Sequence, residues 1–230
     1  MKKTIFILML VLGFTTIVSA QYKPSKGFDA EVNFRPFNAN PISIDYLKVR
    51  MFLNEKMAIR LGFEFNSYSE TNKVAIPAGS TNKVEQVTNN SYFIFGLHPG
   101  IEIHMATDAE RLSPYFGAEL NFSMKSASTD ITGVGNDPTK SGTVSGAWNG
   151  GTNPGYTIIG LNLLFGADYY IAKHIYMGAE LGFGFQSASG KDIVTTNVVS
   201  GVSTAVTNPG SSSFNLGVNF NSAFRLGWSF

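Results

Sequence analysis

Cysteine is absent from this 230-residue chain, and charged residues are scarce, at 14%. Without cysteine the chain has no disulfide, no thiolate metal site and no thiol for lipid attachment. The formal net charge is only +1, so no basic or acidic excess points to nucleic acid as a partner. What the chain has in abundance is glycine and phenylalanine, with 24 and 19 residues.

Long apolar runs are also scarce, and the one that occurs lies in the first twenty residues. Lys2 and Lys3 precede it, and the small residues Ser19 and Ala20 end it. This order is typical of a secretory signal peptide, so we expect cleavage after Ala20, with an uncleaved membrane anchor as the alternative. No second run is long enough for a transmembrane helix. We therefore predict a signal peptide at 1–20, a linker at 21–27 and one exported domain at 28–230.

Strict alternation is the feature that the sequence does contain, most clearly in residues 214–230. Every second residue from Phe214 to Phe230 is apolar except Ser222, and the residues between them are polar or small. We call each of these two alternating sets of residues a parity of the strand. Successive side chains on a strand point to opposite faces, so this stretch has one apolar and one polar face. It is much longer than an ordinary strand of about 5–6 residues. Such a strand is typical of a membrane-spanning barrel.

Seven earlier stretches show the same alternation. They are residues 28–37, 42–53, 57–68, 91–105, 114–125, 156–171 and 175–187. The apolar parity shifts within 42–53, which predicts a bulge near Asp45 or Tyr46. On the apolar parity of 91–105, Pro99 cannot donate a hydrogen bond and predicts a bulge or a weak point in the ladder.

The connections between these stretches alternate in length. Short turns at 54–56, 106–113 and 172–174 alternate with long polar loops at 67–90, 126–155 and 188–213, and 38–41 is a short exception. Outer-membrane barrels have an even strand count, short periplasmic turns and long outer loops. We therefore predict an all-β fold, an eight-stranded antiparallel up-and-down transmembrane β-barrel in the bacterial outer membrane.

Three other architectures fit the pattern less well. A soluble lipocalin-like barrel turns its polar parity to water, but here that parity is rich in glycine with only isolated charges. A sandwich has shorter strands, and a fibrous repeat would show a sequence period, which is absent.

Two stretches that follow short turns carry a family resemblance. They read PYFGAEL at 114–120 and IYMGAEL at 175–181, and aromatic or apolar residues alternate at the end of the chain. The chain resembles the OmpA/OmpX-type eight-stranded outer-membrane barrels of Gram-negative bacteria, and among them the outer membrane protein beta-barrel domain proteins of Bacteroidota. The resemblance implies an assembly signal, read by the barrel-assembly machinery during biogenesis, made of Phe224, Leu226, Trp228 and Phe230.

Charged residues on the polar parity predict how the lumen is filled. Eight strands enclose a lumen only just wide enough for side chains, so inward charges must be paired or hydrated. Counted from the short turns, most of these charges fall at similar depth. We predict an ion-pair network that plugs the periplasmic half of the lumen, formed by Glu31, Lys48, Arg50, Arg60, Glu102, Glu119, Asp168, Glu180 and Arg225. The outer half carries small or neutral residues such as Gly96, Ser123 and Asn162, and is our candidate for a small-ligand pocket.

The histidines give little support to catalysis or metal binding. His98, Glu102 and His104 share the lumenal parity, but the two histidines are about 20 Å apart along a strand and cannot share an ion. Glu102 and His104 are close enough, yet no third ligand is evident. No nucleophile elbow, HExxH motif or phosphate loop occurs. We therefore expect no enzyme, no metal site and no cofactor.

Aromatic residues concentrate near the strand ends, where lipid meets water in outer-membrane barrels. We predict an aromatic girdle on the short-turn side, formed by Tyr115, Phe116, Tyr169, Tyr170, Tyr176 and Trp228. The partners expected for such a barrel are outer-membrane lipid and lipopolysaccharide. A protein partner through the loops 67–90, 126–155 and 188–213 is also expected, because these loops are long and near neutral.

The leading functional hypothesis is a non-enzymatic barrel with a plugged lumen and a structural or surface-interaction role, as an accessory subunit of a larger outer-membrane complex. The first alternative is a narrow pore or small-ligand barrel that uses the outer half of the lumen. The second alternative is a lipid-modifying enzyme of the outer membrane.

Overall fold

The structure is a computed structural model that describes residues 26–34, 42–76, 79, 84–220 and 224–230. The expected signal peptide at 1–20, most of the linker at 21–27 and the turn at 38–41 lie outside these residues. Among the described residues, no helix is long and apolar enough to cross a membrane.

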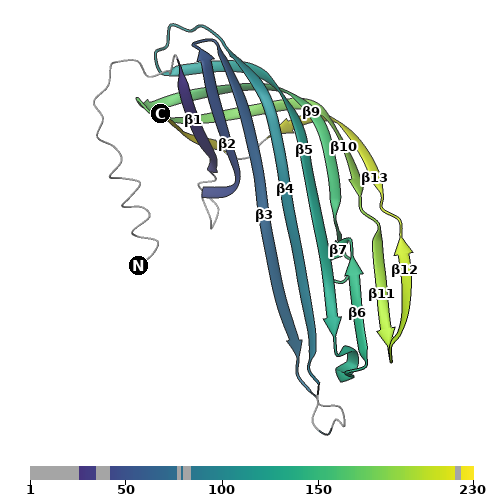
Figure 1. The fold of residues 1–230 in the computed structure, drawn as a ribbon. Helices are drawn as coiled ribbons and strands as arrows, with labels where there is room; N and C mark the ends of the chain where they lie inside the picture. The colour runs from purple at the N-terminus through teal and green to yellow at the C-terminus, as the bar shows by residue number, and fades with distance from the viewer. Residues whose placement is uncertain (1–25, 35–41, 77–78, 80–83, 221–223) are drawn as a thin grey trace, which may run out of the picture.

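A closed antiparallel ring of eight strand positions forms the barrel, in the upper part of Figure 1. The ring consists of β1 (Gly27–Phe34), β2 (Ile42–Asn54), β3 (Met57–Val74), β4 (Gln86–His104), β5 (Leu112–Thr132), β9 (Tyr156–Ala172), β10 (Ile175–Gly190) and, as the eighth position, β13 (Ser212–Phe220) followed by β14 (Phe224–Ser229). β5 pairs with β9, and β14 pairs with both β1 and β10, which closes the ring. The predicted up-and-down barrel is confirmed, including its closure by the last strand against the first.

Two irregularities fall where the sequence indicated them. β1 pairs Val32 with Leu47 and then Asn33 with Ser43, so residues 44–46 have no partner in β1 and form a bulge on that side of β2. Between β4 and β5 the pairing passes from Leu97 directly to Gly100 without a change of register, which leaves the ladder interrupted beside Pro99.

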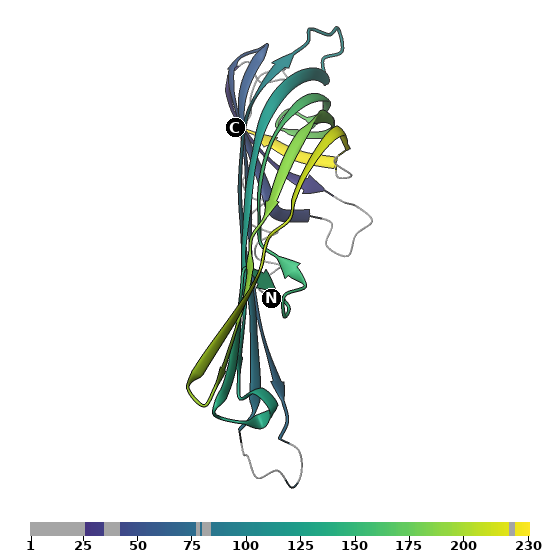
Figure 2. The same ribbon diagram turned by 90° about the vertical axis from the view of Figure 1, so that its right-hand side faces the viewer.

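Beyond the barrel, three strands continue far past the length that a membrane requires. β3, β4 and β5 have 18, 19 and 21 residues, whereas a transmembrane strand needs about 9–11. Their distal halves carry an extension that we call the paddle. Its strands run in the order β12 (Val202–Asn208), β11 (Ile193–Val199), β6 (Lys140–Ser145), β5, β4 and β3. Figure 2 shows it edge-on as a thin sheet below the barrel.

Much of the paddle is formed by segments that the sequence predicted as loops. The prediction of three long polar loops was therefore wrong, because these segments contain strands. Residues 126–155 and 188–213 contain a 3₁₀ turn and short strands, namely η1 (Val134–Asn136), β6 (Lys140–Ser145), β7 (Ala147–Trp148), β8 (Asn153–Pro154), β11 (Ile193–Val199) and β12 (Val202–Asn208). The apolar alternation does not continue into the paddle. The backbone ladder continues in Ser- and Thr-rich sequence that gives no apolar alternation.

A small aromatic cluster orders one face of the paddle. The ring of Trp148 packs edge-on against Tyr68 and Tyr92, with centroids 5.9 and 5.7 Å away, and the two tyrosine rings stack on each other. Nearby, Thr129 donates a buried hydrogen bond of 2.8 Å to the side chain of Asn90. Tyr68 and Tyr92 lie on the lumenal parity of β3 and β4, so the inner face of the barrel continues into the paddle.

Candidate functional site

A layer of buried charges fills the lumen of the barrel near its short-turn end. Every strand position of the ring contributes to it, and none of the side chains is more than 11% exposed. The layer consists of Asp29, Glu31, Lys48, Arg50, Arg60, Glu102, Glu119, Asp168, Glu180 and Arg225. We call it the charge layer. It contains all nine residues that the sequence placed in a lumenal network.

Arg50 is the centre of one half of the charge layer. Its Nη2 atom lies 2.8 Å from Asp29, and its Nη1 atom lies 3.0 Å from Glu102 and 2.7 Å from Asp168. The guanidinium group also sits over the Tyr176 ring, 4.8 Å from its centroid. A planar guanidinium has several donors in a fixed plane and can serve three carboxylates at once, which a lysine ammonium cannot do with the same geometry.

Arg60 occupies the corresponding position in the other half. It lies 2.7 Å from Glu180 and 2.8 Å from both Glu102 and Glu119. Glu102 is therefore shared between Arg50 and Arg60, and it joins the two halves into one network.

Lys48 and Arg225 complete the charge layer. Lys48 lies 2.8 Å from Glu31 and 3.7 Å from Glu180. Arg225 lies 2.7 Å from Asp168 and 3.1 Å from Glu31. Each cation thus contacts at least two carboxylates, and such buried charges are tolerated only when they are paired and hydrogen-bonded.

Asp29 belongs to the charge layer although the sequence analysis left it out. It is fully buried and pairs with Arg50. The signal was present, because Asp29 shares the inward parity of β1 with Glu31. With Asp29 included, the layer contains six carboxyl groups and four cationic groups, an excess of two acidic groups.

An aromatic layer lies between the charge layer and the short turns. It is formed by Phe52, His104, Tyr115, Tyr170 and Tyr176, all at most 3% exposed. The rings contact one another, with centroids 5.2 Å apart for Phe52 and His104 and 5.4 Å apart for Tyr170 and Tyr176. The Tyr176 hydroxyl donates to Glu31 at 2.9 Å, and the Tyr115 hydroxyl donates to Glu180. The aromatic layer therefore covers the charge layer on the side of the short turns.

The prediction of a lipid-facing girdle was wrong for Tyr115, Tyr170 and Tyr176, because all three are fully buried in the lumen. Their positions follow from parity, since Tyr115 has the parity of Glu119 and Tyr170 that of Asp168. Phe116 and Tyr169 do lie outside the barrel, 42% and 50% exposed.

Glycines opposite two of the tyrosines make room for their rings. Tyr115 is paired across the ladder with Gly166, and Tyr176 with Gly227. A β-carbon at Gly166 would lie 2.4 Å from the Tyr115 ring, and one at Gly227 would lie 2.0 Å from the Tyr176 ring. Each ring therefore lies flat against the backbone of the neighbouring strand, which a larger residue would prevent.

The four residues of the expected assembly signal lie on the outward parity of the last strand and beyond it. Phe224 and Phe230 are exposed, 47% and 75%, and Leu226 and Trp228 are partly exposed. The Trp228 ring lies near the rings of His174 and Phe230, with centroids 6.5 and 6.4 Å away. Trp228 is thus the outward aromatic residue at this end of β14.

Three residues at the lumenal edge of the aromatic layer have the composition of a hydrolytic triad. His104 Nδ1 lies 2.8 Å from Ser113 Oγ, and His104 Nε2 lies 3.3 Å from Glu102. Ser113 is fully buried, however, and Glu102 is already paired with two arginines. A nucleophile must be reachable by a substrate, and this hydroxyl is not. No group of three or more metal-ligating side chains occurs in the described part of the chain.

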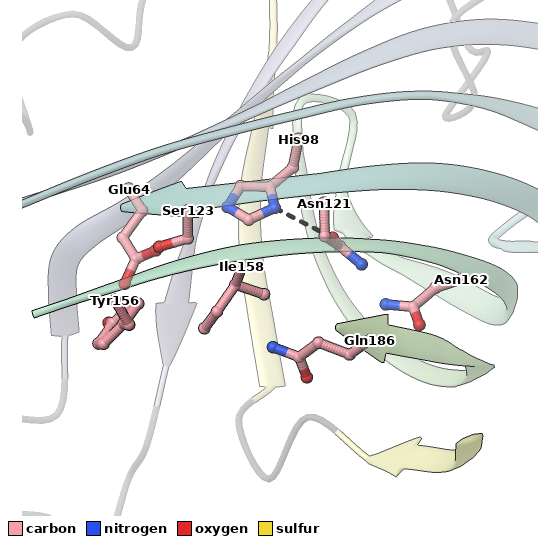
Figure 3. Close-up of a pocket in the computed structure, with 8 residues that line it drawn as sticks. All are labelled: Glu64, His98, Asn121, Ser123, Tyr156, Ile158, Asn162 and Gln186. Carbon is pink, nitrogen blue, oxygen red and sulfur yellow. Dashed lines mark hydrogen bonds between the residues drawn. The ribbon is translucent and has the colours of Figure 1, made fainter. Parts of the chain in front are cut away.

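A cavity of about 320 Å³ lies in the lumen on the far side of the charge layer from the aromatic layer. Its walls come from five consecutive ring strands and consist of Glu64, His98, Asn121, Ser123, Tyr156, Ile158, Asn162 and Gln186. Figure 3 shows these side chains around the space, with His98 bonded to Asn121. Ser123 and Asn162, which were predicted for the outer pocket, line this cavity. His98 and Gln186 also line it, although they were not predicted as wall residues.

Comparison with known proteins agrees with this architecture. Residues 36–186 match the OmpA-OmpF-like porin family. The chain belongs to this family. It is an outer-membrane β-barrel protein, and the exposed apolar parity of its strands faces lipid.

A solved structure, CarO2 of Acinetobacter baumannii, is similar to this barrel at 12% sequence identity. The match covers 89% of this chain and 98% of CarO2, with a TM-score of 0.34. A search of curated protein sequences gave no match.

Proposed function

We propose that this family member is a non-enzymatic outer-membrane barrel whose lumen is closed and whose paddle binds a protein partner at the cell surface. In this arrangement it acts as a structural or accessory subunit of a larger outer-membrane complex. The expected signal peptide at 1–20 directs its export. The apolar exterior contacts outer-membrane lipid and lipopolysaccharide, and the residues Phe224, Leu226, Trp228 and Phe230 guide barrel assembly.

The charge layer is the observation that supports a closed lumen. It draws on every strand position of the ring, its members are at most 11% exposed, and the aromatic layer covers it. A water-filled pore requires exposed polar side chains along its whole length. A solute crossing this barrel would have to separate several buried ion pairs, each of which is costly to break.

Recording from planar lipid bilayers tests closure directly. We expect the purified protein to give no stable, large single-channel currents. Arg225→Ala removes the side chain that joins Glu31 and Asp168 and should raise the conductance. Lys73→Ala in the paddle, whose partner Glu85 is 3.5 Å away at the surface, serves as the control and should change nothing. Steady large currents from the unmodified protein would overturn the proposal.

The free edge of the paddle supports a protein partner. β12 is the last strand of the sheet, and all of its residues are exposed. Natural edge strands are normally protected by charges, proline or bulges, but β12 reads VSTAVTN and has none of these. An uncharged edge of this kind accepts an extended segment of another protein as a further strand.

A lysine placed on this edge tests the proposed docking. We expect Val206→Lys to abolish co-purification of the partner from native outer membranes, because an edge charge opposes strand addition. Val199→Lys is the matched control, since Val199 is also exposed but lies on β11, away from the edge. Equal recovery of the partner with both variants would refute docking at β12, and recovery of a second copy alone would make the occupant this chain itself.

The buried Ser113 supports a non-enzymatic role, because its hydroxyl has no path to a substrate. Assays with lipid A and with peptide substrates test this point. Hydrolysis that disappears in Ser113→Ala, while the variant still folds, would show that the barrel is an enzyme.

A further inference from the structure

The cavity on the paddle side of the charge layer is bordered by two hydrogen-bond acceptors, one from Glu64 and one from His98. A β-carbon built on Gly96 would lie 2.8 Å from Glu64 Oε2 and 2.9 Å from His98 Nε2. Both atoms therefore pack against the same side of Gly96, close enough for one donor group to reach both, although Glu64 and His98 form no ion pair with each other. Only a glycine lets both side chains lie this close to the backbone.

Each acceptor side chain is held in place by a hydrogen bond to a neighbour. Ser123 donates to Glu64 Oε2 at 2.8 Å, and His98 Nδ1 lies 3.0 Å from the Asn121 amide oxygen. An amide oxygen only accepts, so Nδ1 is the donor, and in the neutral imidazole this makes Nε2 an acceptor. Nε2 is buried and has no hydrogen-bond partner in the described structure. A buried acceptor in this state favours a donor from a ligand.

The charge around the cavity has one sign. The eight wall residues include Glu64 but no lysine or arginine, and Glu64 forms no ion pair within the described residues. The charge layer next to the cavity has two more acidic groups than basic groups. Lys125, from the same strand as Ser123, is held with its ammonium 5.2 Å from the Tyr92 ring. The nearby field therefore favours a cation.

We propose that this cavity binds a small organic ammonium ion, with the ammonium group between Glu64 and His98. A primary ammonium has three donors and no acceptor, which matches a carboxylate and a bare imidazole nitrogen. The remaining wall, with Tyr156, Ile158 and Gln186, provides an apolar surface and hydrogen-bonding groups for the rest of the molecule. The volume of about 320 Å³ lies within the range of small-ligand sites.

A metal ion fits this site less well than an ammonium. Only Glu64 and His98 supply metal-ligating atoms, and no cluster of three such side chains occurs in the described chain. The proposal is also independent of lumen closure, because the cavity lies on the paddle side of the charge layer and the charge layer itself closes the lumen. Bilayer currents report on closure, and ligand binding reports on this site, so the two can fail separately.

Titration with three molecules of equal length but different charge tests the site. The probes are 4-amino-1-butanol, 1,4-butanediol and 4-hydroxybutyrate, added to the folded protein in detergent micelles. Binding is followed by calorimetry and by the NMR signals of the His98 ring. We expect the amine to bind at least tenfold more tightly than the diol and the carboxylate not to bind. Equal binding of amine and diol, tighter binding of the carboxylate, or no binding of the amine would each overturn the proposal.

Two variants locate the binding and one serves as a control. Glu64→Gln keeps the shape of the side chain and removes its charge, so amine binding should weaken at least tenfold. Gly96→Ala adds a β-carbon 2.8 and 2.9 Å from the two acceptors, which must then move away, so it should abolish binding. Glu85→Gln removes an exposed carboxylate in the paddle and should leave binding unchanged. Unaltered binding in Glu64→Gln, with the barrel folded as judged by circular dichroism, would refute the assignment.

Discussion

Replacement of Arg50 by methionine should destabilise the barrel strongly. Methionine has a similar length but no charge, so the change removes the ion pairs to Asp29, Glu102 and Asp168. Glu102 retains Arg60 and Asp168 retains Arg225. Asp29, however, loses the only ion pair recorded for it in the described structure, and both members of this pair are fully buried.

The expected magnitude follows from that single orphaned carboxylate. Removal of one partner from a buried ion pair typically costs about 3–5 kcal/mol, because the remaining charge is left without compensation. An exposed pair contributes only about 0–1 kcal/mol. Lys73→Met, which breaks the exposed pair with Glu85, is therefore the matched control. We expect a large loss of unfolding free energy for Arg50→Met and almost none for Lys73→Met.

A double variant separates the ion pair from other effects of Arg50. Asp29→Asn removes the uncompensated charge, so Asp29→Asn/Arg50→Met should be more stable than Arg50→Met by about 2 kcal/mol. Guanidinium unfolding in lipid vesicles, followed by the fluorescence of Trp148 and Trp228, measures these differences. The reasoning fails if Arg50→Met costs no more than Lys73→Met, or if the double variant is less stable than the single one.

Two further predictions concern the aromatic layer and export. Gly227→Val should lower the unfolding free energy by about 1–3 kcal/mol, the typical cost of overpacking, because a side chain there collides with the Tyr176 ring. Gly217→Val is the control and should have little effect, because no atom lies within 4 Å of the added carbon. Equal losses of unfolding free energy in the two variants would contradict the packing argument. Mass spectrometry of the protein from outer membranes should give a mature chain that begins at Gln21, and an intact residue 1 would show that the signal is not cleaved.

Parity explains most of what the sequence predicted correctly and some of what was missed. The alternation of side chains along each strand placed nine residues of the charge layer in the lumen. The same rule, applied without regard to residue type, also places Asp29, Tyr115, Tyr170 and Tyr176 inside. Assigning the tyrosines to a lipid-facing girdle followed the usual preference of aromatic residues and ignored their position on the strand.

By itself the sequence determined the eight strand positions of the barrel, their inward and outward faces and hence the outer-membrane barrel, because a period of two and a continuous apolar face are local properties of the chain. Only the tertiary structure decided which charges meet, since each ion pair joins residues on different strands whose register is set by the whole ring. It also decided that the polar segments after β5 and β10 become the paddle, because their ladder hydrogen bonds come from distant strands. Glu64 and His98 likewise meet beside Gly96 only because β3 and β4 pair in a register that sets Glu64 opposite Gly96.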